Sequence, residues 1–313
     1  MTSDTDDPVR LPAGQPGRPL IPKAEYIQQI HSALAGRYGY ASAKMGCSEK
    51  QWLYYPILLS QKVDARRQRA YEAALAFHFE VQLGLFPANP EFYARYLEVY
   101  SARLRELDCL GLFLDTPELE REIVRYHRAP ARLIYYKNQE PDRSSPGDEN
   151  NCYLPLFAGK RLLLVASHAH FLRQRANAEM FTCVWAKTGK PWFRPASVDS
   201  VEFAYGYDPK TRQDYGNALH WLDSIQRQIA RKDFDIALIA AGGLGIPLAG
   251  FVKSLGRMGL SLGGHLQIIF GVYGARWIVR QNWQTRYFNE YWTRIPPEYR
   301  PGANPLPDDG AYW

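Results

Sequence analysis

The spacing of apolar and polar positions changes about halfway along the chain. In the second half, residues 162–166 and 236–240 are continuous apolar runs of strand length, typical of parallel strands that are buried on both faces. A glycine-rich turn at 242–245 follows the second run, and a helical segment then leads to a short apolar run at 260–262. This order of strands, turn and helices predicts a Rossmann-like α/β part with a C-terminal extension over residues 159–313. Between the first two runs, apolar residues recur at helical spacing at Tyr215, Leu219, Leu222, Ile225 and Ile229.

The first half of the chain carries the periodicity of helices instead. Apolar residues spaced three or four apart predict a helix-turn-helix segment over 23–59 and helices over 65–83, 90–107 and 118–126. The third of these has the clearest start, because Asn89 is suited to cap it and Pro90 to occupy its first position. Residues 23–136 are therefore predicted to form a mainly helical part.

Two segments show no periodic apolar pattern. Residues 1–22 are acidic, contain several prolines and few large apolar groups, and are predicted to be a disordered arm. Residues 137–158 begin with a polar stretch and are predicted to be a loop close to a functional site. The chain starts without the basic and apolar regions of a signal peptide, and its apolar runs are too short to span a bilayer.

Composition narrows the function classes further. The 38 basic and 32 acidic residues leave a formal charge of +6, but the cations are scattered, which favours a solvated surface over nucleic-acid binding. The four cysteines, at 47, 109, 152 and 183, form no CxxC pair. This spacing argues against a disulfide framework or a zinc cluster and indicates a cytoplasmic protein with reduced thiols.

Parallel strands joined in this way place their ligand at the carboxyl ends of the strands. The segments predicted to lie there are 167–170, 241–245 and 263–265. Gly242, Gly243 and Gly245 would allow the backbone to approach a ligand closely, and the following helix start would offer N–H groups to a phosphate. The turn departs from the GxGxxG fingerprint and residues 260–262 supply no acid for a ribose, so an NAD site is disfavoured. A tight turn without a ligand is the alternative.

Three more groups of residues are candidates for chemistry. His265 follows the last strand and is placed to bond a phosphate or a sugar hydroxyl, although single histidines are commonly structural. Glu49 is a candidate general base or metal ligand. The alternative is an ordinary helix start, with Ser48 as N-cap and Glu49 in the first turn. His168 and His170 have no convincing third ligand nearby for zinc, so a polar site is favoured there over a metal.

A succession of motifs runs through the C-terminal half. A glycine turn followed by Pro-Leu-Ala occupies 242–249, Gly-Gly-x-x-Gln-x-x-Phe-Gly occupies 263–271 and Gly-x-Arg-Trp occupies 274–277, with further matches at 289–294 and 310–313. In these motifs the chain resembles the GT-D-type bacterial glycosyltransferases and their glycosyltransferase-like relatives, which are often tied to capsular or other surface-polysaccharide biosynthesis. The resemblance spans nearly everything after the arm and is more specific in the C-terminal half.

This resemblance implies a GT-D fold and the transfer of a sugar from a nucleotide-sugar donor to a glycan or another hydroxyl acceptor. In the family's characterised branch, an Asp-x-Glu pair near the N-terminus is associated with the metal and the donor diphosphate. The pair falls on residues 47–49 of this chain, where Glu49 is present and Cys47 stands in place of the aspartate. The resemblance thus implies Glu49 as a ligand of Mn²⁺ or Mg²⁺, and Cys47 puts the dependence on a metal in doubt.

Together, the strand-end positions and the resemblance select the site residues. Glu49, Lys44 and His265 are expected to be catalytic. Trp283, Tyr291 and Trp292 are candidates to stack on a sugar ring, but core packing is the favoured role for each of them. The residues expected to bind the donor are Gly46, Ser48, Gly242, Gly243, Gly245, Gly263, Gly264, Gln267 and Arg276.

Two other functions remain open. A non-catalytic nucleotide- or glycan-binding protein of a polysaccharide pathway is favoured by Cys47 in the carboxylate motif. A methyltransferase-like enzyme would need an acidic residue after the second strand to hold a ribose, and none is placed convincingly there. A lipid-linked acceptor would add peripheral membrane association to the cytoplasmic location.

Overall fold

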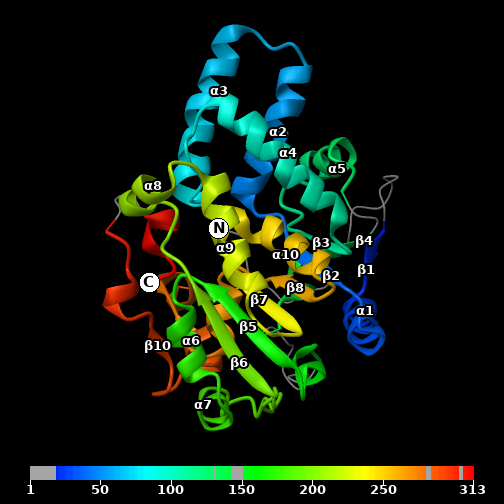
Figure 1. Cartoon of the computed structure of the whole chain (residues 1–313), viewed down its shortest axis with the longest axis vertical. Coiled ribbons are helices and arrows are strands. Elements are labelled where there is room, and N and C mark those ends of the chain that lie inside the picture. Colours follow the sequence, from blue (N-terminus) through cyan, green and yellow to red (C-terminus); the bar gives the residue numbers. More distant parts are fainter. Residues whose placement is uncertain (1–18, 130–131, 142–150, 280–282, 303–305) are drawn as a thin grey trace.

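A twisted, all-parallel sheet of eight strands forms the centre of the computed structural model, which confirms the predicted Rossmann-like α/β class (Figure 1). The structure describes residues 19–129, 132–141, 151–279, 283–302 and 306–313. The strand order across the sheet is β1-β4-β3-β2-β8-β7-β5-β6. The strands are β1 (Leu20–Ile21), β2 (Tyr40–Lys44), β3 (Cys109–Leu112), β4 (Arg132–Tyr135), β5 (Arg161–Ala166), β6 (Ser197–Glu202), β7 (Ile236–Ala240) and β8 (Met258–Ser261).

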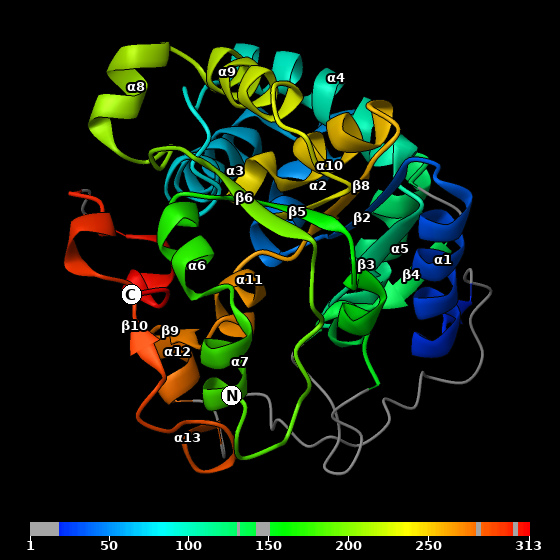
Figure 2. The same cartoon turned by 60° about the horizontal axis from the view of Figure 1, so that its bottom comes forward.

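Helices cover both faces of this sheet (Figure 2). One face carries α2 (Cys47–Ser60), α4 (Pro90–Glu106), α5 (Pro117–Tyr126), α9 (Ala218–Ala230) and α10 (Gly245–Ser254). The other face carries α1 (Lys23–Gly36), α6 (Ala169–Arg175), α7 (Ala178–Val184) and α11 (His265–Ile269). Further elements are α3 (Ala65–Phe77), α8 (Pro209–Tyr215), α12 (Ala275–Ile278), α13 (Trp283–Arg286) and a two-stranded sheet of β9 (Val272–Tyr273) and β10 (Thr293–Arg294).

Strand alternation divides the interior into two hydrophobic clusters. In β5, Leu163 and Val165 belong to the cluster on one face, while Leu162, Leu164 and Ala166 belong to the other. Successive side chains of a strand point to opposite faces, so a strand covered by helices on both sides must be apolar at every position. This requirement explains the continuous apolar runs of β5 and β7.

The predicted helical part, residues 23–136, also contributes strands to the sheet. β2 pairs with β3 on one side and with β8 on the other, so the two predicted parts share one continuous sheet. The β2 sequence is Tyr-Ala-Ser-Ala-Lys, and small residues give only a weak strand signal. Ala41 and Ala43 are nonetheless fully buried, because helices lie close to both faces at this central position.

The predicted helices of this half are largely confirmed. Asn89 caps α4 as expected, its side-chain oxygen accepting a hydrogen bond of 2.9 Å from the backbone N–H of Phe92. The helix predicted over 65–83 is shorter: α3 ends at Phe77, and a π-helical turn follows over His78–Gln82. Among the helices that the structure describes, none is both long and apolar enough to cross a membrane.

The two segments predicted to be irregular both contain ordered residues, half-buried in the first and fully buried in the second. Residues 1–18 lie outside the described ranges, but Leu20 and Ile21, at the end of the predicted arm, form β1 and pair with β4. Within the predicted loop 137–158, Gln139 and Glu140 are buried and the η3 turn spans Leu154–Phe157. An average over a polar stretch conceals single residues that become buried, which is why the sequence pattern missed them.

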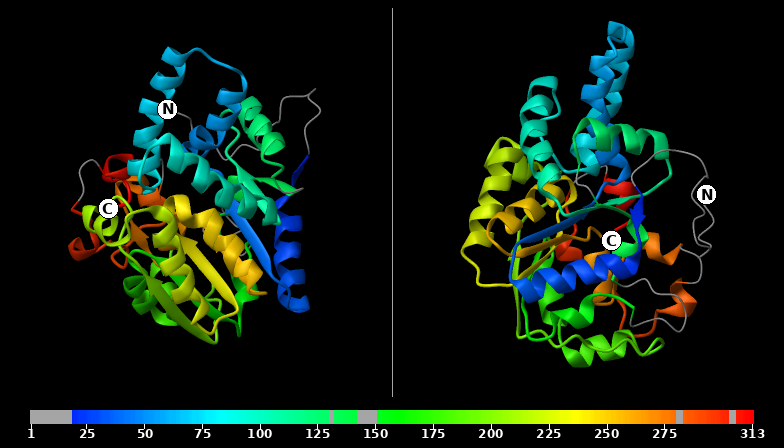
Figure 3. Two further views of the ribbon diagram at one scale, coloured as in Figure 1. Left: turned by 45° about the horizontal axis from the view of Figure 1, so that its top comes forward. Right: turned by 90° about the vertical axis from the view of Figure 1, so that its right-hand side faces the viewer.

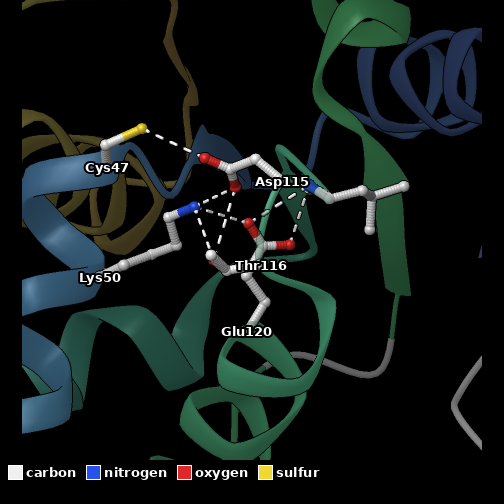
Figure 4. A network of polar contacts seen from close by, with 6 residues as sticks. Cys47, Lys50, Asp115, Thr116 and Glu120 are labelled. Carbon is white, nitrogen blue, oxygen red and sulfur yellow. Dashed lines mark hydrogen bonds and ion pairs between the residues drawn. The ribbon is translucent and has the colours of Figure 1, made fainter. Parts of the chain in front are cut away.

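A buried lysine fastens α2 to the loop between β3 and α5 (Figure 4). The ammonium of Lys50 donates hydrogen bonds to Asp115, to Thr116 at 3.1 Å and to Glu120 at 3.0 Å. The Glu120 carboxylate is fully buried and also accepts from the backbone N–H of Leu114 at 3.0 Å. Burial opposes the charge on Lys50, but the hydrogen bonds to Asp115 and Glu120 outweigh it and raise the pKa of Lys50.

We predict that Lys50→Met destabilises the protein by about 3 kcal/mol, because it leaves the Glu120 carboxylate buried without its cation. Urea unfolding at constant m-value would measure the loss. The matched control is Lys253→Met, which removes a half-exposed ion pair with Asp108 and is expected to cost less than about 1 kcal/mol. Equal losses in the two variants would contradict a special role for the buried network.

Candidate functional site

One pocket runs along the carboxyl ends of the parallel strands and has a volume of about 360 Å³. It is lined by residues that follow β2, β3, β4, β5, β6, β7 and β8. All three predicted strand-end segments contribute, through Ser167 and His168, through Ala241 and Gly242, and through residues 263–265. The chain leaves β5 for β6 on one side and then crosses to β7 on the other. The pocket therefore lies at a change of winding direction, where open α/β sheets bind their ligands.

A buried carboxylate organises the centre of the pocket. Glu140 is only 1% exposed, and its Oε1 lies 2.8 Å from His265 Nε2 and accepts a 3.4 Å hydrogen bond from Lys44 Nζ. Lys44 ends β2 and His265 begins α11 directly after β8, so Glu140 joins groups from neighbouring strands. Two of the three predicted catalytic residues, Lys44 and His265, thus line the pocket and share one carboxylate that the sequence had not marked for a role.

A second cation enters the pocket from the C-terminal extension. Arg276 donates a hydrogen bond of 3.1 Å to the hydroxyl of Tyr312, and its guanidinium lies 4.4 Å from the centre of that ring. Gln267 donates to the backbone oxygen of Tyr312 at 3.3 Å. Added Cβ atoms at Gly264 and Gly274 would lie 2.7 Å from the Tyr312 ring and 2.3 Å from its backbone. Glycine at these positions lets residues 310–313 close against the pocket wall.

The residues of the predicted glycine turn have two different roles. Gly242 lines the pocket with a positive φ of 48°, a conformation that favours glycine. Gly243 and Gly245 lie behind the pocket wall. A Cβ at Gly243 would meet the Leu85 side chain at 2.7 Å, and one at Gly245 would meet Ser261 Oγ at 2.4 Å. In the described structure these two glycines serve close packing and do not line the pocket as the donor-binding prediction required.

The start of α2 brings Gly46, Ser48 and Glu49 to the pocket wall. The N-cap is Gly46 and not Ser48, whose hydroxyl instead lies 3.2 Å from His78 Nδ1. The Glu49 carboxylate folds back over the N-cap, so that a Cβ on Gly46 would lie 2.5 Å from Glu49 Oε2. This is the position of a capping-box glutamate, so its helix-start role and its place in the pocket coexist.

Among the described residues, no group of three or more His, Cys, Asp and Glu side chains is placed to hold a metal ion. Cys47 donates a long hydrogen bond of 3.5 Å to Asp115, and burial raises the pKa of its thiol. A protonated thiol is a poor ligand for Mg²⁺ or Mn²⁺, which prefer oxygen. Glu49 alone would suit only an ion that arrives on a diphosphate.

Stacked aromatic pairs border the pocket on the two sides of this charged centre. Phe113 and Tyr136 follow β3 and β4 and stack in parallel with their ring centres 4.0 Å apart. Tyr205 and Tyr207 follow β6 and stack at 5.0 Å. In the strand order, β2 and β8 lie between these two groups, so the charged residues lie between the aromatic ones along the sheet edge.

The rings that the sequence suggested for stacking lie elsewhere. Trp283 and Trp292 are buried in the core beneath the small β9–β10 sheet, where Trp292 packs against Trp185. Tyr291 is exposed and does not line the pocket. Trp283 and Trp292 thus have the core-packing role that the sequence favoured. The pocket takes its aromatic rings from the loops after β3, β4 and β6, from Trp221 of α9 and from Tyr312 and Trp313.

His168 is a neutral group in the pocket wall. Burial lowers the pKa of His168 to about 4. Its Nδ1 lies 3.4 Å from the Tyr205 hydroxyl, while its buried Nε2 has no hydrogen-bond partner among the described residues. His170 points away and pairs with Glu202, so the two histidines do not converge on a metal.

No family model matches the chain, and no curated protein or solved structure shows significant similarity to it. The residues that line the pocket are therefore the basis of the proposed function.

We predict that His168 makes stability depend on pH. The folded protein keeps His168 neutral down to about pH 4, whereas the unfolded chain takes up a proton near the ordinary value of 6.5. Stability is therefore lost as the pH falls from 6.5 to 4, by up to about 3 kcal/mol from this group. Urea unfolding of His168→Gln across this range should show a shallower loss than the parent protein.

The control for this measurement is His31→Gln, which changes an exposed histidine and should leave the pH dependence as it is in the parent. The buried His127, whose pKa is also lowered by burial, stays in all three proteins. A His168→Gln profile parallel to that of the parent would contradict the prediction.

Proposed function

We propose that the protein is a glycosyltransferase that moves a sugar from a nucleotide-sugar donor to a hydroxyl of a glycan or another acceptor. The observation that carries this proposal is the layout of the pocket along the sheet edge. Cationic and hydrogen-bonding groups occupy its centre, and stacked aromatic pairs border it on both sides. A donor of this kind combines a planar base, a charged diphosphate and a sugar ring, and each has a counterpart in this layout.

In this proposal the diphosphate lies against Lys44 and Arg276, with the backbone at Gly242 and Gly263 close by. Both cations are already held in place, Lys44 by Glu140 and Arg276 by Tyr312. Charges fixed before the reaction stabilise the negative charge that builds up on a leaving diphosphate without further reorganisation. The base stacks on one of the aromatic pairs, and the acceptor approaches from the other side of the charged centre.

The transfer step needs one proton acceptor. The acceptor hydroxyl oxygen forms its bond to the anomeric carbon while the bond from that carbon to the diphosphate breaks. The hydroxyl proton passes to the Glu49 carboxylate, and the nucleoside diphosphate leaves. Glu140, buried between Lys44 and His265, acts as a positioning residue for both. A divalent ion that enters with the diphosphate would add Glu49 as a ligand.

A non-catalytic nucleotide- or glycan-binding protein is the second candidate. The observation in its favour is Cys47, whose protonated thiol bonds to Asp115 at the position where the resembled family carries the metal-associated aspartate. Such a protein would bind the same ligand class in the same pocket without turnover. A member of a polysaccharide pathway would fit either function.

We predict that nucleotide sugars raise the melting temperature of the purified protein. At a hundred times the dissociation constant a ligand adds about 2.7 kcal/mol of stability. A thermal-shift screen with and without Mn²⁺ or Mg²⁺ would measure it, and Arg276→Ala should remove most of the shift. Arg103→Ala, which lies on α4 outside the pocket, is the matched control and should keep it. The absence of any response to nucleotides and nucleotide sugars would overturn the donor-site proposal.

We further predict that Glu49→Gln retains ligand binding and lowers turnover by about 10²- to 10⁴-fold, as expected for loss of a general base. Release of the nucleoside diphosphate from the donor found in the screen measures turnover. Glu98→Gln, an exposed substitution on α4, is the control. Full turnover in Glu49→Gln would remove Glu49 from the mechanism, and binding without turnover in the parent protein would favour the second candidate.

A further inference from the structure

A helical hairpin formed by α2 and α3 projects from the body of the protein (Figures 1 and 3). α2 begins at the pocket with Cys47 and ends at Ser60, and α3 returns from Ala65 to Phe77. At a rise of 1.5 Å per residue, the fourteen residues of α2 carry the hairpin tip about 20 Å from the pocket wall. The tip lies away from the pocket, so ligand binding in the pocket does not account for the side chains that the tip exposes.

The hairpin tip is strongly cationic. Lys62, Arg66, Arg67 and Arg69 are all exposed and lie within eight residues. Four cations against the single carboxylate of Asp64 leave a charge of +3 on this segment, half of the +6 of the whole chain. Among the described residues, none of these four cations forms an ion pair.

The Asp64 carboxylate caps α3 and does not pair with the cationic side chains of the tip. Its Oδ1 accepts hydrogen bonds from the backbone N–H groups of Arg66 and Arg67, at 3.0 and 2.9 Å, and so caps α3. The arginine side chains beside it extend into solvent. The charge of the tip is therefore available to an external partner.

Apolar side chains accompany these cations. Leu59, the residue before the end of α2, is 39% exposed at the tip. Beyond Arg69, the exposed face of α3 consists of Ala70, Ala73, Ala74 and Phe77, and Phe77 is 46% exposed. Residues spaced three, four and seven apart lie on one side of a helix, so this outer face is cationic toward the tip and apolar toward the body.

We propose that the α2–α3 hairpin docks the protein on an anionic lipid bilayer. Cations near an anionic leaflet contribute electrostatic attraction, and leucine, alanine and phenylalanine gain by entering the boundary between headgroups and acyl chains. A nucleic-acid backbone would use the cations but would offer nothing to the exposed apolar face. The combination of the two therefore selects a lipid surface. This inference stands independently of the proposed transferase.

Docking by the outer face of α3 would lay the hairpin along the lipid surface, and α2, which packs against α3, would connect that surface to the pocket. A ligand anchored in the same bilayer would then meet a pocket of fixed height and orientation. Lipid binding would thus explain the projecting hairpin, which is needed neither to complete the sheet nor to form the pocket.

The test is co-sedimentation of the full-length protein with vesicles of phosphatidylcholine alone or with 30% phosphatidylserine. We expect binding to the anionic vesicles that weakens in high salt. Arg66→Glu, Arg67→Glu and Arg69→Glu combined should weaken it by about 100-fold or more, at about tenfold or less per residue neutralised. Positions 66 and 67 lie in the first turn of α3, where glutamate is favourable, and position 69 is exposed, so the triple variant is expected to fold.

Two matched controls keep the result specific. Lys210→Glu, Arg227→Glu and Arg231→Glu combined change the net charge equally on exposed positions of α8 and α9 and should alter binding less than about threefold. Leu59→Ser should weaken binding about fivefold, whereas Leu255→Ser, at 38% exposure elsewhere on the surface, should not.

Three outcomes would overturn the proposal. Equal losses in the two charge-reversal variants would assign binding to the net charge alone. Binding that is indifferent to phosphatidylserine would remove the electrostatic attraction on which the proposal depends. Retention of duplex DNA or RNA at a salt concentration where anionic vesicles are not bound would identify a nucleic-acid surface instead. Circular dichroism and melting temperatures of all variants would confirm that each is folded.

Discussion

The buried carboxylate of Glu140 is the constraint on which the pocket depends. A charge taken out of water is costly unless cations and hydrogen bonds compensate it, and Glu140 meets Lys44 and His265. These partners come from the ends of β2 and β8, which are neighbours in the sheet although more than 200 residues separate them in the chain. The Lys44 ion pair and the His265 contact therefore join both halves of the fold at the point where the pocket opens.

A second buried charge, on α2, is compensated by its neighbours in the same way. Lys50 is surrounded by Asp115, Thr116 and Glu120, and this network holds α2 against the loop after β3 (Figure 4). Because α2 begins in the pocket and ends at the hairpin tip, a single rigid helix relates the candidate site to the candidate lipid-binding surface. Two buried ionic networks thus set the orientation of the groups that are proposed to act, one inside the pocket and one behind its wall.

Glycine has a different importance here from the one that sequence motifs suggest. Gly243, Gly245, Gly264 and Gly274 are confined by neighbouring atoms at 2.3 to 2.7 Å from an added Cβ, and these neighbours are protein groups. Such glycines allow close approach of one part of the chain to another, above all of residues 310–313 to the pocket wall. Only some of the residues in a glycine-rich motif therefore need to line the pocket, and Gly242, Gly263 and Gly264 are the ones that do so here.

The sequence by itself determined those elements whose formation depends on neighbouring residues in the chain. Buried parallel strands must be apolar throughout, and a helix start needs a cap, so β5, β7 and the Asn89 cap of α4 could be read directly from the sequence. Tertiary structure alone decided the rest. β2 became a central strand because two layers of helices bury its small residues. Glu140 became the centre of the site because Lys44 and His265, from distant parts of the chain, converge on it. The aromatic rings of the pocket come from loops after three different strands, from α9 and from the C-terminal residues Tyr312 and Trp313. Spacing along the chain carries no signal for groups that meet only when the sheet is assembled.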